Sequence, residues 1–100
     1  MDVIFRSKKL KKCYLESRLA VRTWGYEVAR KYIERIDIIQ EARNLNELRQ
    51  LPGLNCHPLK GKREGQYAVS LTGFWRLIFT LHGEHLEIVQ IEEVSKHYGD

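Results

Sequence analysis

The chain has 100 residues, of which 43% are apolar, so length and composition predict one globular domain over residues 1–100 and exclude a disordered chain. Its 17 Lys and Arg outnumber its 13 Asp and Glu, and the formal net charge of +4 is compatible with a nucleic acid or an acidic protein as partner. No apolar run is long enough to cross a membrane, and the first residues lack a signal-peptide pattern. The two cysteines, Cys13 and Cys56, form no metal or redox motif, so we expect a reduced, cytoplasmic protein that needs no cofactor.

The beginning of the chain predicts a strand followed by a basic helix. Residues 3–5 form a short apolar run typical of a strand. Ser7 is placed to cap a helix that continues to about residue 17, with Leu10 and Tyr14 on one face. The other face of this helix carries a cluster of cations, Lys8, Lys9, Lys11 and Lys12.

Two further helical segments follow. Thr23 is placed to cap a second helix that runs to about residue 42. Its apolar residues recur at helical spacing: Val28, Ala29, Tyr32, Ile33, Ile36 and Ile39. Residues 44–51 predict a short third helical segment, which Pro52 and Gly53 end.

After Pro52 the apolar period changes to that of strands. Residues 57–61, with the sequence HPLKG, fit no regular element. Residues 66–71 alternate as in a half-buried strand, and Thr72-Gly73 is a hairpin signal. The next strand has an apolar face formed by Trp75, Leu77, Phe79 and Leu81. Residues 86–91 predict a third, central strand, and the tail of the chain follows it directly.

This order of elements predicts the fold class. A strand, then helices, then an antiparallel meander is typical of an α+β domain. We expect an antiparallel sheet of about four strands with two main N-terminal helices packed on one face. The other face is left with isolated polar groups such as Arg76 and Ser70. Such faces, with loops at their ends, are favourable places for a site.

Side chains suited to chemistry come from three separate parts of the chain. They are His57 and Lys60 before the hairpin, Arg76 on its second strand, and Glu92, Glu93, His97 and Tyr98 in the tail. A meander can bring the loop before its first strand and the segment after its third strand to a common region. If these groups converge, they have the parts for RNA cleavage, in which a ribose 2′-OH attacks its own neighbouring phosphate.

Each part of that reaction has a suitable residue type. Histidine can take or supply a proton near neutral pH because its unperturbed pKa is about 6.5. Arg76 and Lys60 could hold the phosphate, and arginine can do so bidentately. Tyr98 could orient the substrate, stack on a base or donate a proton. The scheme requires no metal.

The same residues also have structural interpretations. His57 could be an ordinary loop residue, and Arg76 could pair with Glu87 across the sheet. The terminal pair His97-Tyr98 could be idle. A site at these positions therefore depends on their convergence in the fold.

Three other features have simpler explanations than a binding site. His82 and His85 have His-x-x-His spacing, but no third zinc ligand is evident. Trp24 and Trp75 are more typical of a core than of base stacking. The lysine cluster before residue 13 could be a solvated helix face, yet it holds more cations than solubility needs.

Three strings in the sequence resemble a known family. They are HPLKG at residues 57–61, YAVSLTGFWRLIF at 67–79 and EEVSKHY at 92–98. Together they look like the HigB-type toxins of bacterial type II toxin–antitoxin systems, in the RelE/ParE superfamily that includes plasmid maintenance killer proteins. The resemblance covers about residues 1–98 and is most specific at 57–79. It implies a RelE-like fold and a metal-independent, ribosome-dependent mRNA endonuclease (mRNA interferase) that inhibits translation by 2′-OH attack.

The resemblance assigns roles to the matching positions. It implies a catalytic role for His57, a basic role in the site for Lys60, and phosphate binding for Arg76. The ending differs from the family's usual acid-Tyr-His order, because here His97 precedes Tyr98. Either acid of the pair before them could replace the usual one, and we assign this role to Glu93, with Glu92 as the alternative.

The resemblance also implies partners. These are a HigA-like antitoxin with a helix-turn-helix domain, the ribosome and its mRNA, and operator DNA contacted only through the antitoxin complex. Lys8, Lys9, Lys11 and Lys12 are expected to contact ribosomal RNA, because phosphate contacts carry most sequence-independent affinity. Two alternatives are a non-catalytic, ParE-like toxin that inhibits DNA gyrase and an inert basic module. The ParE-like alternative explains the fold and charge but gives no reason for His57, Lys60, Arg76 and His97 to occur together, whereas a nuclease does.

Overall fold

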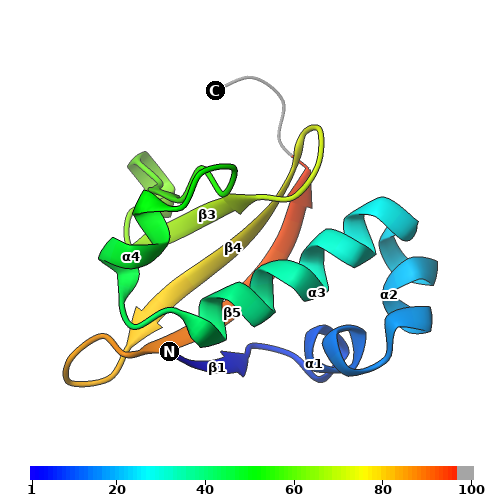
Figure 1. Cartoon of the computed structure of the whole chain (residues 1–100), viewed down its shortest axis with the longest axis horizontal. Helices are drawn as coiled ribbons and strands as arrows, with labels where there is room; N and C mark the ends of the chain where they lie inside the picture. The colour runs from blue at the N-terminus through cyan, green and yellow to red at the C-terminus, as the bar shows by residue number, and fades with distance from the viewer. Residues whose placement is uncertain (97–100) are drawn as a thin grey trace.

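The computed structural model describes residues 1–96, which form one sheet with helices packed against it (Figure 1). The helices are α1 Lys8–Leu15, α2 Ser17–Trp24, α3 Tyr26–Glu41, α4 Leu45–Gln50 and the 3₁₀ helix η1 Gly61–Arg63. The strands are β1 Asp2–Phe5, β2 His57–Pro58, β3 Gln66–Ser70, β4 Trp75–His82 and β5 Ile88–Lys96. The predicted α+β class is confirmed. Within these residues no helix is both long and apolar enough to span a bilayer.

The sheet has five strands in the order β1-β5-β4-β3-β2, one more than the four expected. The additional strand is β2, in the segment that fits no regular pattern, where His57 lies opposite Ala68 and Pro58 opposite Tyr67. Proline has no N–H to donate, so it is tolerated at a sheet edge, where β2 lies. The sheet is also not wholly antiparallel. Strand β1 pairs with β5 in parallel, which the helices and strands between them in the chain make possible.

The helix boundaries correct one prediction. The predicted cap Ser7 is confirmed, since its hydroxyl accepts a hydrogen bond from the Leu10 amide at 3.1 Å. The predicted cap at Thr23 is wrong, because Thr23 lies inside α2 and its hydroxyl donates to the Leu19 carbonyl at 2.8 Å. The break instead falls at Gly25, whose φ of 88° is disfavoured for other residues, and α3 begins directly after it.

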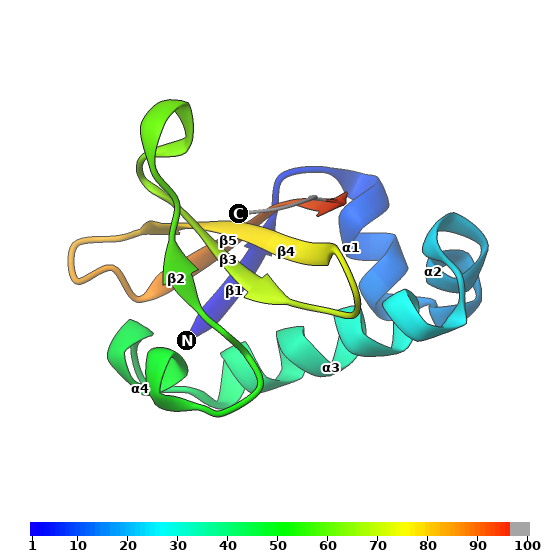
Figure 2. The same cartoon turned by 90° about the horizontal axis from the view of Figure 1, so that it is seen from above.

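One face of the sheet packs on α3, and Figure 2 shows this helix running beneath the strands. Fully buried Tyr32, Ile36 and Ile39 of α3 share a core with residues of the central strands. The sheet contributes Val69, Leu77, Phe79, Val89 and Ile91. Val69, Leu77 and Phe79 are inward positions expected from the period-2 alternation of β3 and β4, and the expected Tyr67, Trp75 and Leu81 pack against this core while partly buried. A smaller cluster of Leu59, Ala68 and Ile78 is separate from that core.

Strand β5 extends five residues beyond its predicted end at Ile91, and it reaches Lys96 by way of a bulge. Phe79 of β4 lies opposite Ile91, whereas the preceding Ile78 lies opposite Glu93, so Glu92 is the extra residue. Without an extra residue the alternation would bring Glu93 to the core face and Val94 to the reverse. The bulge allows Val94 to pack against the core and places Ser95 opposite Arg76.

The core assignment gives a stability prediction. Replacing fully buried Phe79 with Ala should lower the free energy of unfolding by about 3–5 kcal/mol, because removal of the ring leaves a cavity. Urea denaturation followed by circular dichroism measures this change. Leu15→Ala is the control, since Leu15 is 66% exposed and its truncation should cost no more than about 0.5 kcal/mol. Equal effects of the two substitutions would contradict the placement of Phe79.

Candidate active site

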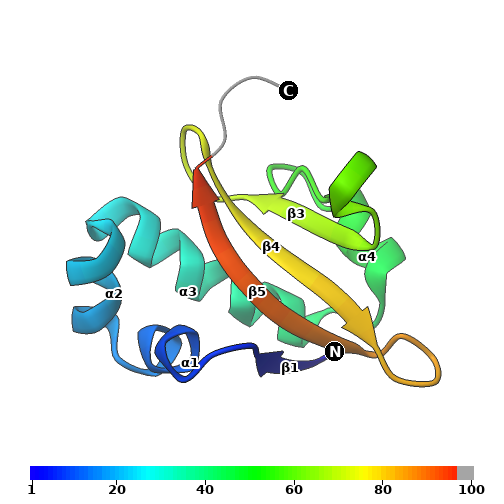
Figure 3. The same ribbon diagram turned by 180° about the vertical axis from the view of Figure 1, so that it is seen from behind.

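A depression of about 610 Å³ lies where β2, the η1 turn, the start of β4 and the end of β5 meet. Figure 3 views the face of the sheet opposite α3, with the start of β4 beside the end of β5. The depression is lined by His57, Pro58, Leu59, Lys60, Arg63, Arg76, Ser95 and Lys96. The structure therefore brings together three residues singled out from the sequence, His57, Lys60 and Arg76.

Arg76 lies in the second residue of β4, and strands on both sides hold its backbone. It is opposite Ser70 of β3 and opposite Ser95 of β5, and its side chain is half-buried. The suggested ion pair of Arg76 with Glu87 is wrong, because Glu87 precedes β5 and accepts a hydrogen bond from the His85 amide at 2.9 Å. Arg76 is thus placed by the sheet register beside the small Ser95.

The protonation pattern of His57 follows from one hydrogen bond. Its Nδ1 lies 2.7 Å from the Asn55 carbonyl oxygen. A carbonyl only accepts hydrogen bonds, so Nδ1 carries the proton and Nε2 is the nitrogen that can take one up in the neutral ring. Asn55 has a φ of 49°, a conformation that asparagine tolerates better than most residues. This turn sets the orientation of the imidazole at the half-buried rim of the depression.

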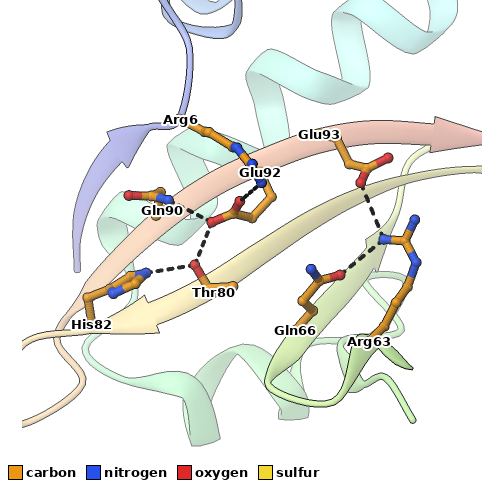
Figure 4. Close-up of polar contacts among 8 residues, drawn as sticks. All are labelled: Arg6, Arg63, Gln66, Thr80, His82, Gln90, Glu92 and Glu93. Carbon is orange, nitrogen blue, oxygen red and sulfur yellow. Dashed lines mark hydrogen bonds and ion pairs between the residues drawn. The ribbon is translucent and has the colours of Figure 1, made fainter. Parts of the chain in front are cut away.

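Sequence reasoning missed three lining residues, Arg63, Ser95 and Lys96. Arg63 of η1 contacts Gln66 Oε1 at 3.0 Å and Glu93 Oε2 at 3.3 Å through its Nη1 atom (Figure 4). The basic string KGKR at residues 60–63 was a signal for Arg63. Ser95 and Lys96 lie in the family-like string at residues 92–98 but received no role, because the bulge in β5 decides which way they point.

The electrostatic character of the depression is cationic. Four of its lining residues are Lys60, Arg63, Arg76 and Lys96, and the part of its lining that the structure describes contains no acid. Glu93 pairs with Arg63, whereas Glu92 belongs to a different cluster. Such a site favours an anion, and guanidinium groups favour phosphate in particular.

Neighbouring Cys56 is not suited to be a nucleophile. Its thiol is buried, and burial raises the pKa of Cys56 to about 11 even though Arg49 acts in the opposite direction. A thiol with this pKa carries almost no thiolate near neutral pH. The lining groups suited to chemistry are therefore the cations and the imidazole of His57.

The remaining predicted residues lie elsewhere or outside the described residues. His97 and Tyr98 fall outside the described residues 1–96. The predicted RNA-binding lysines, Lys8, Lys9, Lys11 and Lys12, are all exposed on α1 and do not line the depression. His82 has its Nε2 atom 2.8 Å from the Thr80 hydroxyl. Residues 1–96 contain no group of three His, Cys, Asp or Glu side chains that could hold a metal.

Glu92 is the centre of a separate polar cluster on the same strands (Figure 4). Its side chain is 7% exposed and contacts Arg6 at 3.0 Å, the Thr80 hydroxyl at 2.7 Å and the Gln90 amide at 2.7 Å. Burial alone would raise the pKa of Glu92, but the hydrogen bonds from Thr80, Gln90 and Arg6 outweigh it and lower the pKa below its usual value. The cluster joins β4, β5 and Arg6, the residue after β1, through one ionised carboxylate.

Comparison with known proteins agrees with this architecture. Residues 3–93 match the family described as HigB-like toxin, the RelE-like toxin of type II toxin–antitoxin system HigB. No protein of curated function is similar in sequence at a significant level.

Solved structures with the same fold include three toxins of low sequence identity. The YoeB/ParE toxin from Agrobacterium tumefaciens has 15% identity and a TM-score of 0.61, covering 98% of this chain and 100% of that one. The YoeB-YefM complex from Staphylococcus aureus has 18% identity and a TM-score of 0.63, covering 98% of both chains. YafQ from E. coli strain BL21(DE3) has 19% identity and a TM-score of 0.58, covering 95% of this chain and 91% of that one.

The fold is RelE-like, as the resemblance in the sequence predicts, and the solved toxin structures share it. Within it the chain belongs to the HigB-like toxins of type II toxin–antitoxin systems, since the family match extends over residues 3–93. A toxin of a type II system is paired with an antitoxin, and one structural neighbour is a complex of that kind, YoeB with YefM.

The Glu92 cluster predicts a pH dependence of stability. A carboxylate with a pKa lower in the folded than in the unfolded chain stabilises the fold above its unfolded pKa, near 4.5, and this contribution disappears as the pH falls through the folded pKa. The difference in unfolding free energy between the parent and Glu92→Gln should therefore be largest near neutral pH and shrink in acid. Urea titrations between about pH 3 and pH 7 measure it.

Glu84→Gln is the matched control, because Glu84 is exposed in the turn between β4 and β5. Its difference from the parent should change little over this range. The predicted role of Glu92 is wrong if the two substitutions give the same pH profile.

Proposed function

We propose that the protein is a ribosome-dependent mRNA endonuclease, as the family resemblance implies. The observation that carries this proposal is the convergence of His57, Lys60 and Arg76 on one cationic depression. A gyrase inhibitor would have no use for an imidazole oriented beside four cations. A nuclease needs both, because it moves protons and stabilises the charge that develops on a phosphate.

The geometry suggests which residue carries out each step of the reaction. His57 Nε2 takes the proton of the ribose 2′-OH, since Nδ1 is occupied by the Asn55 carbonyl. The 2′-oxygen then bonds to phosphorus while the bond to the 5′-oxygen breaks, leaving a 2′,3′-cyclic phosphate and a 5′-hydroxyl. Arg76 and Lys60 bind the non-bridging oxygens of the phosphate. The backbone of Arg76 is already positioned by the strands on both sides of it.

The departing 5′-oxygen needs a proton, which we assign to His97 or Tyr98, the residues that follow Lys96 in the chain. Glu93 acts through Arg63, since its carboxylate pairs with that guanidinium at the edge of the depression. We therefore keep Glu93, and not Glu92, as the acid of the site. The scheme works without a metal.

The proposed partners follow from the same reaction. The ribosome presents the message, so the small depression needs to bind only the scissile phosphate and its neighbours. A HigA-like antitoxin would restrain the toxin and carry the contact with operator DNA. We place this function in the cytoplasm, where ribosomes translate.

Removal of either central side chain should abolish toxicity. His57→Ala removes the base and Arg76→Ala a phosphate ligand, so each should slow cleavage of ribosome-bound mRNA by about 10²- to 10⁴-fold. Mapping of mRNA 5′ ends after expression in cells measures cleavage, and growth measures toxicity. His85→Ala is the control, since it removes an exposed histidine in the turn between β4 and β5.

Circular dichroism of the purified variants distinguishes a defect in chemistry from a defect in structure. Folded His57→Ala and Arg76→Ala variants that remain fully toxic would rule out the catalytic assignment. Chromosomal DNA breaks with intact mRNA would instead indicate gyrase as the target.

The basic face of α1 should contribute to ribosome binding. Replacing exposed Lys8, Lys9 and Lys12 with Gln should weaken association with ribosomes and reduce its salt dependence, by about one unit of slope for each phosphate that is no longer bound. Co-sedimentation with ribosomes at several salt concentrations measures both effects. Replacing Arg18, Arg22 and Arg30 with Gln gives the same change in net charge at exposed helix positions and serves as control. Equal weakening by both triple variants would show that only net charge matters.

A further inference from the structure

A second hollow, which we call the aromatic cleft, lies between the start of α3 and the turn that joins β3 to β4. Figures 1 and 2 both show this turn beside the first residues of α3. The hollow has a volume of about 470 Å³, and four aromatic residues line it, Trp24, Tyr26, Phe74 and Trp75. Four of the chain's ten aromatic residues are thus gathered at one surface feature.

The core fixes the inner part of the aromatic cleft, and the outer part is open to solvent. Trp24 packs against buried Tyr32, with ring centroids 4.6 Å apart, and Trp75 is half-buried against the same core. Tyr26 is 66% exposed and Phe74 is 55% exposed. The exposed rings of Tyr26 and Phe74 add little to the core, because most of their surface faces solvent. Exposed apolar patches of this kind mark binding surfaces.

Lys96 connects the aromatic cleft to the cationic depression, because it lines both. Its Nζ atom lies 5.6 Å from the centre of the Trp75 ring. Trp75 directly precedes Arg76 on β4, and consecutive strand residues point to opposite faces of the sheet, so the aromatic cleft and the cationic depression open on opposite faces. Lys96, at the end of β5, is the residue at which the two hollows meet.

We propose that the aromatic cleft binds nucleotide bases of single-stranded RNA that flank the phosphate held at Arg76. This inference rests on the proposed nuclease function and extends it to the substrate on one side of the cut. Aromatic rings stack on any base, and a cation beside them attracts the backbone, which is the usual composition of a surface for single strands. A protein partner is less well matched, because Lys96 joins the aromatic rings to a cationic depression, although Glu27 also lines the cleft.

The test uses the purified chain and a fluorescent hexanucleotide of 2′-O-methyl RNA, which lacks the 2′-OH and is not cleaved. Fluorescence anisotropy at low salt measures its affinity. Tyr26→Ala and Phe74→Ala should each weaken binding about 5- to 100-fold, the usual cost of removing a stacking ring. Tyr26→Phe, which keeps the ring, should bind like the parent. Leu15→Ala removes an equally exposed apolar side chain on α1 and should change nothing.

A second probe separates base stacking from phosphate binding. A hexanucleotide with abasic sites should bind the parent and Tyr26→Ala with the same reduced affinity, since the stacked bases are missing. The inference is overturned if the parent does not bind the intact probe, or if Tyr26→Ala and Phe74→Ala bind it as the parent does. It is also overturned if these variants keep RNA affinity but no longer bind the antitoxin, which would make the cleft a protein interface.

The outcomes for the cleft and for the nuclease function can be distinguished. Cleavage of ribosome-bound mRNA that depends on His57 but is the same in Tyr26→Ala would leave the nuclease proposal standing without the cleft. If Tyr26→Ala binds the probe more weakly than the parent but the parent cleaves no mRNA, the cleft would stand as a binding surface and the nuclease proposal would fail.

Discussion

The pairing of β4 with β5, with one extra residue at Glu92, is the constraint on which the rest of the structure depends. It joins the meander to the parallel edge strand β1, and it buries Leu77, Phe79 and Ile91 against α3. The extra residue shifts the alternation by one position, so Val94 faces the core and Ser95 lies opposite Arg76. The buried carboxylate of Glu92 is held at this point by three neighbouring side chains, which fixes the bulge in place.

The candidate active site uses this frame to hold like charges close together. Four cations at one depression repel each other, and the carboxylate of Glu93, 3.3 Å from Arg63, offsets part of that repulsion. The remaining cost is tolerable because the depression is open to water, which screens the charges. A bound phosphate would reduce this repulsion between the cations. The reduction would contribute to the free energy of phosphate binding.

Membership of the HigB-like family and the low identity of the structural neighbours are compatible for a physical reason. The YoeB and YafQ structures share the fold at 15–19% identity. A sheet that packs on one long helix needs apolar residues at the right period, and many side chains satisfy that need. Function depends instead on a few polar residues placed on this scaffold, so it has to be argued from the site.

The sequence by itself determined the periodic features of this protein, because period follows from local geometry: the α+β class, the long helix ending near residue 42 and the inward faces of β3 and β4. The strings that resemble the HigB-type toxins identified His57, Lys60 and Arg76 as candidate site residues. Only the tertiary structure decided which groups meet. The edge strand β2 forms only because β3 offers it a partner, and the break at Gly25 overrides the cap expected at Thr23. Arg63, Ser95 and Lys96 reach the site through a turn and a bulge, whose positions depend on contacts between distant residues and leave no periodic pattern in the chain.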